Sequence, residues 1–152
     1  MWQRSFAYYE QVTTHDSSLS TCIYSIMASR LGQVEKAYEY FGESAKLDLF
    51  NTHKNTKDGI HTANMGGTYM AMVYGFGGLR MKEQGIFLNP VIPGRWQGYR
   101  FRFLYEDASL EVSVDQKGCR ISLLKGSAKE IGVYGRNYRI EPGKELEVAV
   151  KQ

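Results

Sequence analysis

Two periodicities divide the chain, and the change between them falls near residue 85. Before that point, apolar residues recur at spacings of three and four, which is the spacing of one face of an α-helix. After it, apolar and polar residues alternate with a period of two, which is typical of strands with one buried face. We therefore predict an α+β chain with a helical part over residues 1–84 and a β part over residues 85–152.

The helical part contains three predicted helices. The first carries Leu19 and Ile23 on its apolar face and ends near Gly32, a residue suited to the left-handed position after a helix. The second is predicted over about 34–46, with acidic residues on its solvent side. The third is predicted over about 67–80, and its narrow polar face indicates burial on most sides.

The β part begins with Phe101, Phe103 and Tyr105 on one face of a strand. The next apolar run starts at Leu110, and the segment 106–109 is short enough to be a hairpin loop, so the two runs should pair antiparallel. Glycine-containing turns separate further predicted strands around 121–123, 133, 138–140 and 146–150. An antiparallel sandwich of about six strands follows.

Composition excludes several classes of protein. The chain has 152 residues, of which 43% are hydrophobic, so it can bury a core. Its formal charge of +3 comes from 19 basic and 16 acidic residues without a run typical of nucleic-acid arms or membrane surfaces. No apolar stretch approaches the ~18–20 residues needed to span a bilayer, and the N-terminus lacks a secretion signal. We expect a soluble cytoplasmic protein.

Two cysteines, Cys22 and Cys119, stand far apart without the ligand spacing of a zinc site. We interpret them as buried thiols, and we expect neither a metal nor an organic cofactor.

A polar loop between the second and third predicted helices is a candidate anion site. Gly66 and Gly67 leave backbone N–H groups uncovered, and a helix start adds the positive end of its dipole. His61 and nearby lysines can supply charge or further donors. The alternative is that the glycines only ease the loop into a buried helix, while His61 is a hydrogen-bonded core histidine.

A second polar cluster, THDSSLS over residues 14–20, precedes the first predicted helix. Ser17 or Ser18 can be an ordinary N-cap there. His15 beside Asp16 suggests a base with an orienting partner, but such a relay is defined by arrangement in space and not by adjacency.

Several strings give the chain a family resemblance. YYEQVTTHDSSLS, KAYEYF, AKLDLF, NTKDGIHTANMGGTY and YGFGGLR, in this order, resemble the end of the helical barrel in disaccharide phosphorylases of glycoside hydrolase family 65. The later LNPVIPGRWQGYRFRFLYEDASLEVSV resembles their C-terminal β domain. The resemblance implies the last helices of a six-hairpin α/α barrel, followed by an antiparallel β-sandwich.

The chemistry that the resemblance implies is inverting phosphorolysis. Inorganic phosphate, the co-substrate, attacks the anomeric carbon of an α-linked glucose disaccharide while a glutamic acid protonates the leaving oxygen, giving β-glucose 1-phosphate and glucose. Phosphate replaces the activated water of an inverting hydrolase. Its site therefore needs N–H groups, hydroxyls and a histidine, because a second carboxylate would repel the nucleophile. Maltose, trehalose, kojibiose and nigerose all remain possible substrates.

By motif position, the resemblance implies a phosphate site of hydroxyls, an imidazole and the backbone donors of a turn. Its residues are Ser17, Ser18, His61, Asn64, Met65, Gly66 and Gly67. The general acid of the family lies upstream of the HDSSLS segment, and no stretch of this chain resembles its motif. We therefore expect no catalytic residue here.

Three predicted helices are only a quarter of a twelve-helix barrel, so each should leave an apolar flank uncovered. We expect a missing N-terminal barrel portion, a partner chain or a second copy to cover these flanks. Two other hypotheses stay open: an anion-binding regulatory domain that uses the DGIH loop, and a non-catalytic carbohydrate-binding or oligomerisation module. The second would use the aromatic residues Trp96, Tyr99, Tyr105, Tyr134 and Tyr138.

Overall fold

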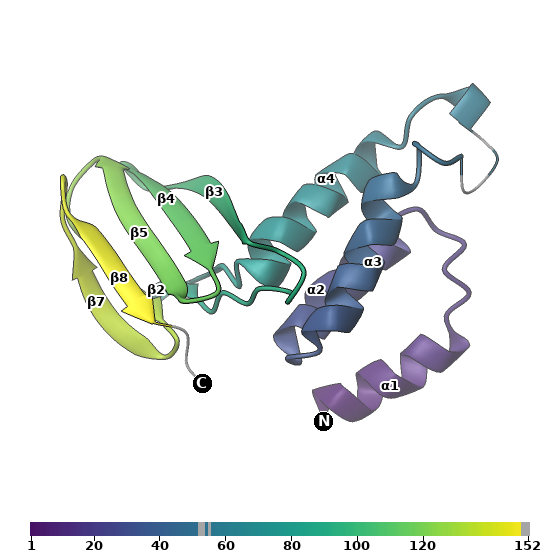
Figure 1. The fold of residues 1–152 in the computed structure, drawn as a ribbon, viewed down its shortest axis with the longest axis horizontal. Coiled ribbons are helices and arrows are strands. Elements are labelled where there is room, and N and C mark those ends of the chain that lie inside the picture. Colours follow the sequence, from purple (N-terminus) through teal and green to yellow (C-terminus); the bar gives the residue numbers. More distant parts are fainter. Residues whose placement is uncertain (52–53, 55, 150–152) are drawn as a thin grey trace. The chain divides into compact units, whose positions relative to one another are not determined.

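The computed structural model describes residues 1–51, 54 and 56–149, and it is a mixed α+β structure as predicted (Figure 1). The chain forms two compact units, which divide between Gly75 and Phe76. This division lies N-terminal to the boundary predicted after residue 84, because the β unit already includes a short strand at Arg80.

The first unit is helical. Its elements are α1 (Trp2–Val12), α2 (Ser20–Arg30), α3 (Val34–Lys46), the 3₁₀ turn η1 (Thr56–Asp58), α4 (Thr62–Met70) and the π-helical segment η2, which runs on from α4 over Ala71–Phe76. The sequence pattern missed α1, because Phe6 is its only buried residue while Tyr8 and Tyr9 are exposed.

Helices α2 and α3 correspond to the first two predicted helices, and a short turn joins them. Gly32 has a φ of +74°, so it occupies the left-handed position that ends α2. The buried Ser25 hydroxyl donates a 2.8 Å hydrogen bond to the Ala37 carbonyl oxygen across the helix pair. A small hydroxyl residue at this contact therefore satisfies its own polar group while the helices stay close.

Helix α4 packs closely along α2, and both run in the same direction. Gly67 faces Cys22 so tightly that a methyl group on Gly67 would overlap the Cys22 Sγ. Gly75, further along, faces the Ile26 backbone and the Ser29 hydroxyl, where a methyl group would lie 3.4 Å and 3.3 Å from them. The two contacts occur in the same order along both helices, so α2 and α4 are parallel.

The start of the third helix was predicted too late. The sequence pattern placed it near Gly67, whereas α4 begins at Thr62. Two consecutive glycines suggested a loop, but packing against Cys22 makes a glycine favourable at position 67 inside the helix. Tertiary packing here overrides the low helix propensity of glycine.

The second unit consists of two four-stranded sheets. One contains β1 (Arg80–Lys82), β2 (Gly85–Leu88), β6 (Lys129–Val133) and β7 (Arg136–Ile140), and the other contains β3 (Gly98–Tyr105), β4 (Ala108–Asp115), β5 (Gly118–Lys125) and β8 (Glu145–Ala149). The described residues thus form eight strands instead of about six. All pairs are antiparallel except β2 with β6, so the prediction of a wholly antiparallel sandwich was wrong at this pair.

The hairpin between β3 and β4 agrees with the prediction, with Tyr105 paired to Ala108. Glu106 in its two-residue turn has a φ of +54°. Alternate residues of both sheets fill the core, and the most deeply buried are Ile86, Leu88, Leu110, Val112, Val114, Ile121, Ile131, Val133 and Ile140. The period-two pattern therefore identified the buried faces of the long strands correctly.

Both cysteines are free and buried, and burial raises the pKa of the Cys119 thiol to about 11. None of the described helices combines the length and apolar character needed to cross a membrane.

The packing of Gly67 gives a testable prediction. Gly67→Ala should destabilise the helical unit by about 1–3 kcal/mol, because the added methyl group forces α4 away from Cys22. Gly66→Ala is the matched control: its side chain would meet open space, so it should stabilise α4 by about 0.5–1 kcal/mol. Urea unfolding followed by circular dichroism measures both changes. Equal effects of the two substitutions would show that α2 and α4 do not pack in this way.

Candidate functional site

The N-terminal ends of α2 and α4 lie at the same end of the helical unit. Gly67 is level with Cys22, and the helices start at Thr62 and Ser20. At a rise of about 1.5 Å per residue, these two starts differ in height by only roughly 5 Å. The positive ends of two helix dipoles therefore point in the same direction from neighbouring positions, an arrangement that favours an anion.

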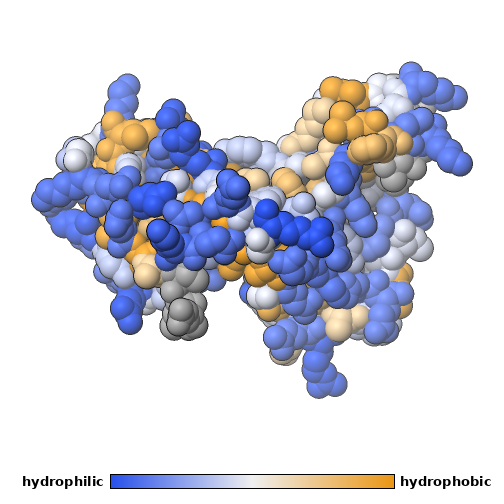
Figure 2. Space-filling view, viewed as in Figure 1, coloured by the Kyte–Doolittle hydropathy of each residue, from blue (hydrophilic) through white to orange (hydrophobic). Residues whose placement is uncertain are grey.

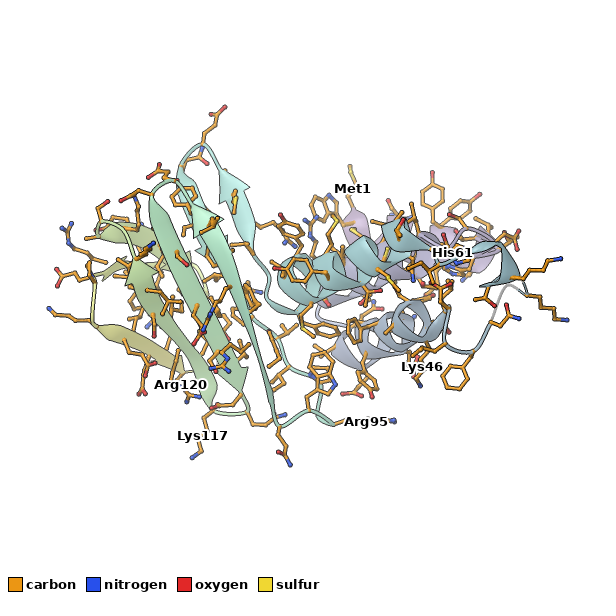
Figure 3. All side chains as sticks on the ribbon, turned by 90° about the horizontal axis from the view of Figure 1, so that it is seen from above. Met1, Lys46, His61, Arg95, Lys117 and Arg120 are labelled. Atoms are coloured by element: carbon orange, nitrogen blue, oxygen red, sulfur yellow. The ribbon has the colours of Figure 1, made fainter. Side chains whose placement is uncertain are left out.

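His61 is the N-cap residue of α4 and is fixed by Asp48. The Asp48 carboxylate oxygens lie 2.5 Å from the His61 Nδ1 and 2.9 Å from its backbone N. The side chain of His61, which is labelled in Figure 3, is 21% exposed, so its ring is half-buried. With Nδ1 turned to a carboxylate, the orientation of the ring and of its Nε2 edge is set.

The sequence reasoning did not assign a role to Asp48. Hydrogen bonds from the His61 ring and from the His61 backbone N–H lower the pKa of the Asp48 carboxyl below its ordinary value. Both carboxylate oxygens of Asp48 accept hydrogen bonds from His61. The carboxylate is therefore not directed toward a third group for which it could act as a base. Its position after α3, within the string AKLDLF, was visible in the sequence, but its partner lies 13 positions away in the chain.

Ser17 and Ser18 precede α2 but do not cap it through their side chains in the usual way. The N-cap residue is Leu19, and its backbone N–H donates a 3.3 Å hydrogen bond to the Ser17 hydroxyl. The Ser20 backbone N–H donates to the Ser17 carbonyl oxygen. Within the described part of the chain, the half-buried Ser18 hydroxyl has no hydrogen-bond partner. One hydroxyl at this helix start is therefore available to a ligand.

Asn64 has a structural role that the sequence reasoning missed. Its side chain is 3% exposed, and its amide donates to the Ser44 carbonyl oxygen at 2.8 Å while it accepts from the Ser44 hydroxyl at 2.8 Å. The Ser44 hydroxyl is also 2.6 Å from the Thr68 hydroxyl. These bonds tie α3 to α4 and occupy the side chain of Asn64.

We expected the backbone N–H groups of residues 64–67 to form a turn that donates to phosphate, but in the structure these groups belong to α4. The backbone N–H groups of Asn64 and Met65 donate to the His61 carbonyl oxygen, at 2.9 Å and 3.1 Å. Gly66 and Gly67 lie inside α4, where backbone N–H groups bond to carbonyl oxygens one turn earlier. Of the predicted site residues, Ser17 and Ser18 thus lie just before the start of α2, and His61 lies at the start of α4.

The segments between α3 and the first turns of α4 expose several apolar side chains. Residues 52, 53 and 55 of the predicted polar loop lie outside the described residues, and Lys54 and Lys57 are exposed. Figure 2 shows apolar surface at the end of the helical unit where α3 and α4 are joined. The exposed apolar residues of these segments are Leu49, Phe50, Ile60 and Met65.

The aromatic residues proposed as a sugar platform in the β unit are partly covered by the protein. Trp96, Tyr99, Tyr105, Tyr134 and Tyr138 are all half-buried. The Tyr99 hydroxyl lies 2.7 Å from the Phe76 carbonyl oxygen and 3.0 Å from that of Val91, and burial raises its pKa. Trp96 packs against Phe76 and Tyr99. Trp96 and Tyr99 therefore fasten the segment before β3.

Comparisons with known proteins agree with the two-part organisation. The glycosyl hydrolase family 65 central catalytic domain matches residues 1–70, and the family 65 C-terminal domain matches residues 79–140. The chain belongs to glycoside hydrolase family 65.

Its relatives include disaccharide phosphorylases with different substrates. The α,α-trehalose phosphorylase of Geobacillus stearothermophilus is 56% identical over 144 residues, covering 95% of this chain and 19% of the relative. The maltose phosphorylase of Bacillus subtilis (strain 168) is 36% identical over 132 residues, covering 87% of this chain and 17% of the relative. A solved structure described as a kojibiose phosphorylase from the human microbiome superimposes with a TM-score of 0.88 at 36% identity, covering 95% and 19%. The chain spans about a fifth of the length of these relatives.

The Asp48–His61 contact predicts a pH dependence. Because the pKa of Asp48 is lowered in the folded state, the contact stabilises the fold above the ordinary aspartate pKa of about 3.9, and the stabilisation is lost as the pH falls through the lower folded value. The difference in free energy of unfolding between the wild-type chain and Asp48→Asn should therefore shrink below about pH 4.

Urea unfolding at a series of pH values measures this difference. Asp16→Asn serves as the control, since the exposed Asp16 only accepts a bond from its neighbour Thr14. If the difference in free energy of unfolding between the wild-type chain and Asp48→Asn did not change with pH, the result would contradict the Asp48–His61 contact.

Proposed function

We propose that this chain supplies the last helices of an α/α barrel and the C-terminal β domain of an inverting phosphorylase acting on an α-linked glucose disaccharide. In this proposal, Ser17, Ser18 and His61 bind the attacking phosphate. The observation that carries it is that α2 and α4 start at the same end of the helical unit, with Ser17 and Ser18 just before one start and His61 at the other. The general acid is proposed to come from outside this chain.

The electrostatics of the site support an anion as its ligand. Two helix starts contribute positive dipole ends, and hydroxyls and an imidazole supply donors without adding a negative charge. The carboxylate nearest to His61, that of Asp48, directs both of its oxygens to His61. A phosphate dianion at the helix starts would therefore face donors instead of a second base.

The reaction assigns these donors a definite role. A phosphate oxygen attacks the anomeric carbon as the glycosidic C–O bond breaks, and the general acid protonates the leaving oxygen, so β-glucose 1-phosphate and glucose result. The side chains of this chain would hold the other phosphate oxygens and aim the attacking one. Such positioning lowers the barrier because the two reactants meet already oriented.

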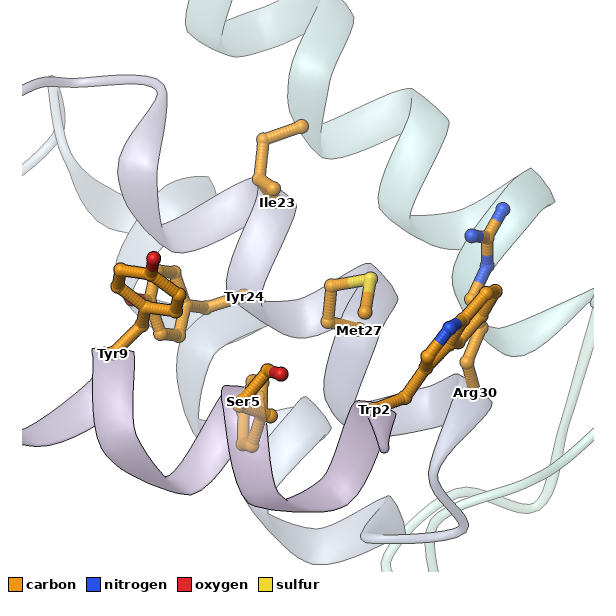
Figure 4. A pocket seen from close by; sticks show the side chains of 8 residues that line it. Trp2, Ser5, Tyr9, Ile23, Tyr24, Met27 and Arg30 are labelled. Carbon is orange, nitrogen blue, oxygen red and sulfur yellow. The ribbon is translucent and has the colours of Figure 1, made fainter.

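The helical unit has features that suit a partial barrel. Helices α2 and α4 run parallel, and α3 connects them. A groove of about 530 Å³ opens between α1 and α2 and is lined mainly by apolar side chains, including Trp2, Phe6, Ile23 and Met27 (Figure 4). Uncovered apolar surface of this kind supports the proposal that further helices of the same enzyme pack here.

The proposal can be tested by exchange with a relative. The chain would replace the matching region of the Geobacillus stearothermophilus trehalose phosphorylase, to which it is 56% identical. We expect the chimera to release glucose 1-phosphate from trehalose and phosphate. His61→Ala in the chimera should raise KM for phosphate by about 10- to 100-fold, the loss expected for one charge-assisted hydrogen bond, with little change in KM for trehalose.

Gly66→Ala in the same chimera is the control, since position 66 is an exposed helix position with open space around it. It should leave both KM values unchanged. An active chimera in which His61→Ala alters KM for trehalose but not for phosphate would refute the assignment. If the 152-residue chain alone catalysed disaccharide phosphorolysis, the proposal that the general acid comes from outside this chain would be refuted.

A further inference from the structure

His15 occupies an unusual position just before the two serines. Its backbone has a φ of +56°, a left-handed conformation that few non-glycine residues adopt and in which histidine, asparagine and aspartate are enriched. Its Nδ1 shares a 2.7 Å hydrogen bond with the hydroxyl of Ser20, the first residue of α2. The ring stands edge-on to Tyr24 with centroids 4.7 Å apart, and its centroid is 5.4 Å from that of Tyr40.

The two tyrosines that hold the ring are themselves fastened to other helices. The Tyr40 hydroxyl donates a 3.0 Å bond to Glu10 on α1, and the second Glu10 oxygen pairs with Lys36 on α3 at 2.7 Å. The Tyr24 hydroxyl lies 2.5 Å from the Thr13 hydroxyl at the end of α1. His15 therefore rests on a support built from α1, α2 and α3.

This support fixes the path of the chain toward the serines. The left-handed residue turns the chain back onto α2, and Ser17 and Ser18 follow within three positions. His15 does not pair with its neighbour Asp16, whose carboxylate accepts from Thr14 at 2.7 Å. The histidine thus acts on the arrangement of the loop and not as one half of an acid–base relay.

We propose that His15 is a positioning residue for the phosphate contacts of Ser17 and Ser18, acting through its bond to Ser20 and its packing against Tyr24 and Tyr40. The inference rests on the proposed phosphate site. It adds a residue that does not touch phosphate itself, because its ring is directed to Ser20 and the tyrosines.

The test is a titration of the ¹⁵N-labelled chain with inorganic phosphate at constant ionic strength, followed through its backbone amide signals. The wild-type signals of Ser17, Ser18 and His61 should shift together. His15→Gly suits the left-handed backbone but removes the ring, and Ser20→Ala keeps the ring but removes its bond. Each should raise the phosphate Kd by about fivefold, the effect of one lost hydrogen bond.

Added imidazole should restore phosphate binding to His15→Gly by occupying the space beside Tyr24 and Tyr40, and it should have no effect on Ser20→Ala. Thr14→Ala is the control, since it removes only an exposed bond in the same loop. Wild-type phosphate affinity in both variants would overturn the role of His15 and leave the phosphate site standing. If phosphate shifted none of the amide signals of Ser17, Ser18 and His61 in the wild-type chain, the proposed phosphate site and the role of His15 would both be overturned.

Discussion

The close approach of α4 to α2 is the constraint on which the helical unit depends. At Gly67 a hydrogen atom takes the place of a side chain, so the Cys22 sulfur can lie against the α4 backbone. This contact sets the distance and the parallel direction of the two helices, and with them the level at which both begin. Were the helices spread by the width of a methyl group, the serines before α2 and the histidine before α4 would no longer share one end at the same spacing.

Each of the two helix starts carries a histidine whose ring is held by another side chain. His61 is held by a carboxylate and lies directly at the helix start, whereas His15 is held by a hydroxyl and two aromatic rings one turn earlier in the chain. The same residue type thus meets two environments, one ionic and one largely apolar. Preorganisation of this kind removes the need to order side chains when an anion arrives, which lowers the entropic cost of binding.

Periodicity predicted the elements whose burial is one-sided. Helix α3 and the strands β3 to β5 agree with the expected ranges because their apolar residues follow a single face. Helix α2 also lies where it was predicted, but Leu19 and Ile23, which were expected on its apolar face, are exposed, and small residues such as Cys22 are buried instead. The start of α4 could not be predicted, since its two glycines indicate a loop until Cys22 is known to lie beside one of them. Asn64 was assigned to a ligand for a similar reason: its bonds to Ser44 join residues 20 positions apart. Local sequence carries no signal for such partners. Ser17 and Ser18 adjoin a helix start that the pattern indicates, whereas His61 was singled out by the resemblance and by the polar loop that contains it.

The parallel pairing of β2 with β6 has a consequence for the order in which the β unit assembles. β2 ends at Leu88 and its partner begins at Lys129, and the segment between them contains the whole β3–β4–β5 meander. The meander strands join through short turns, so their loops close at little entropic cost. β2 cannot pair with β6 until the chain has passed through the meander, because β6 follows the meander in the sequence. During synthesis the unit would therefore pass through a stage in which one sheet is nearly built while Ile86 and Leu88 of β2 still lack the packing that β6 provides. Apolar residues exposed in this interval favour misfolding.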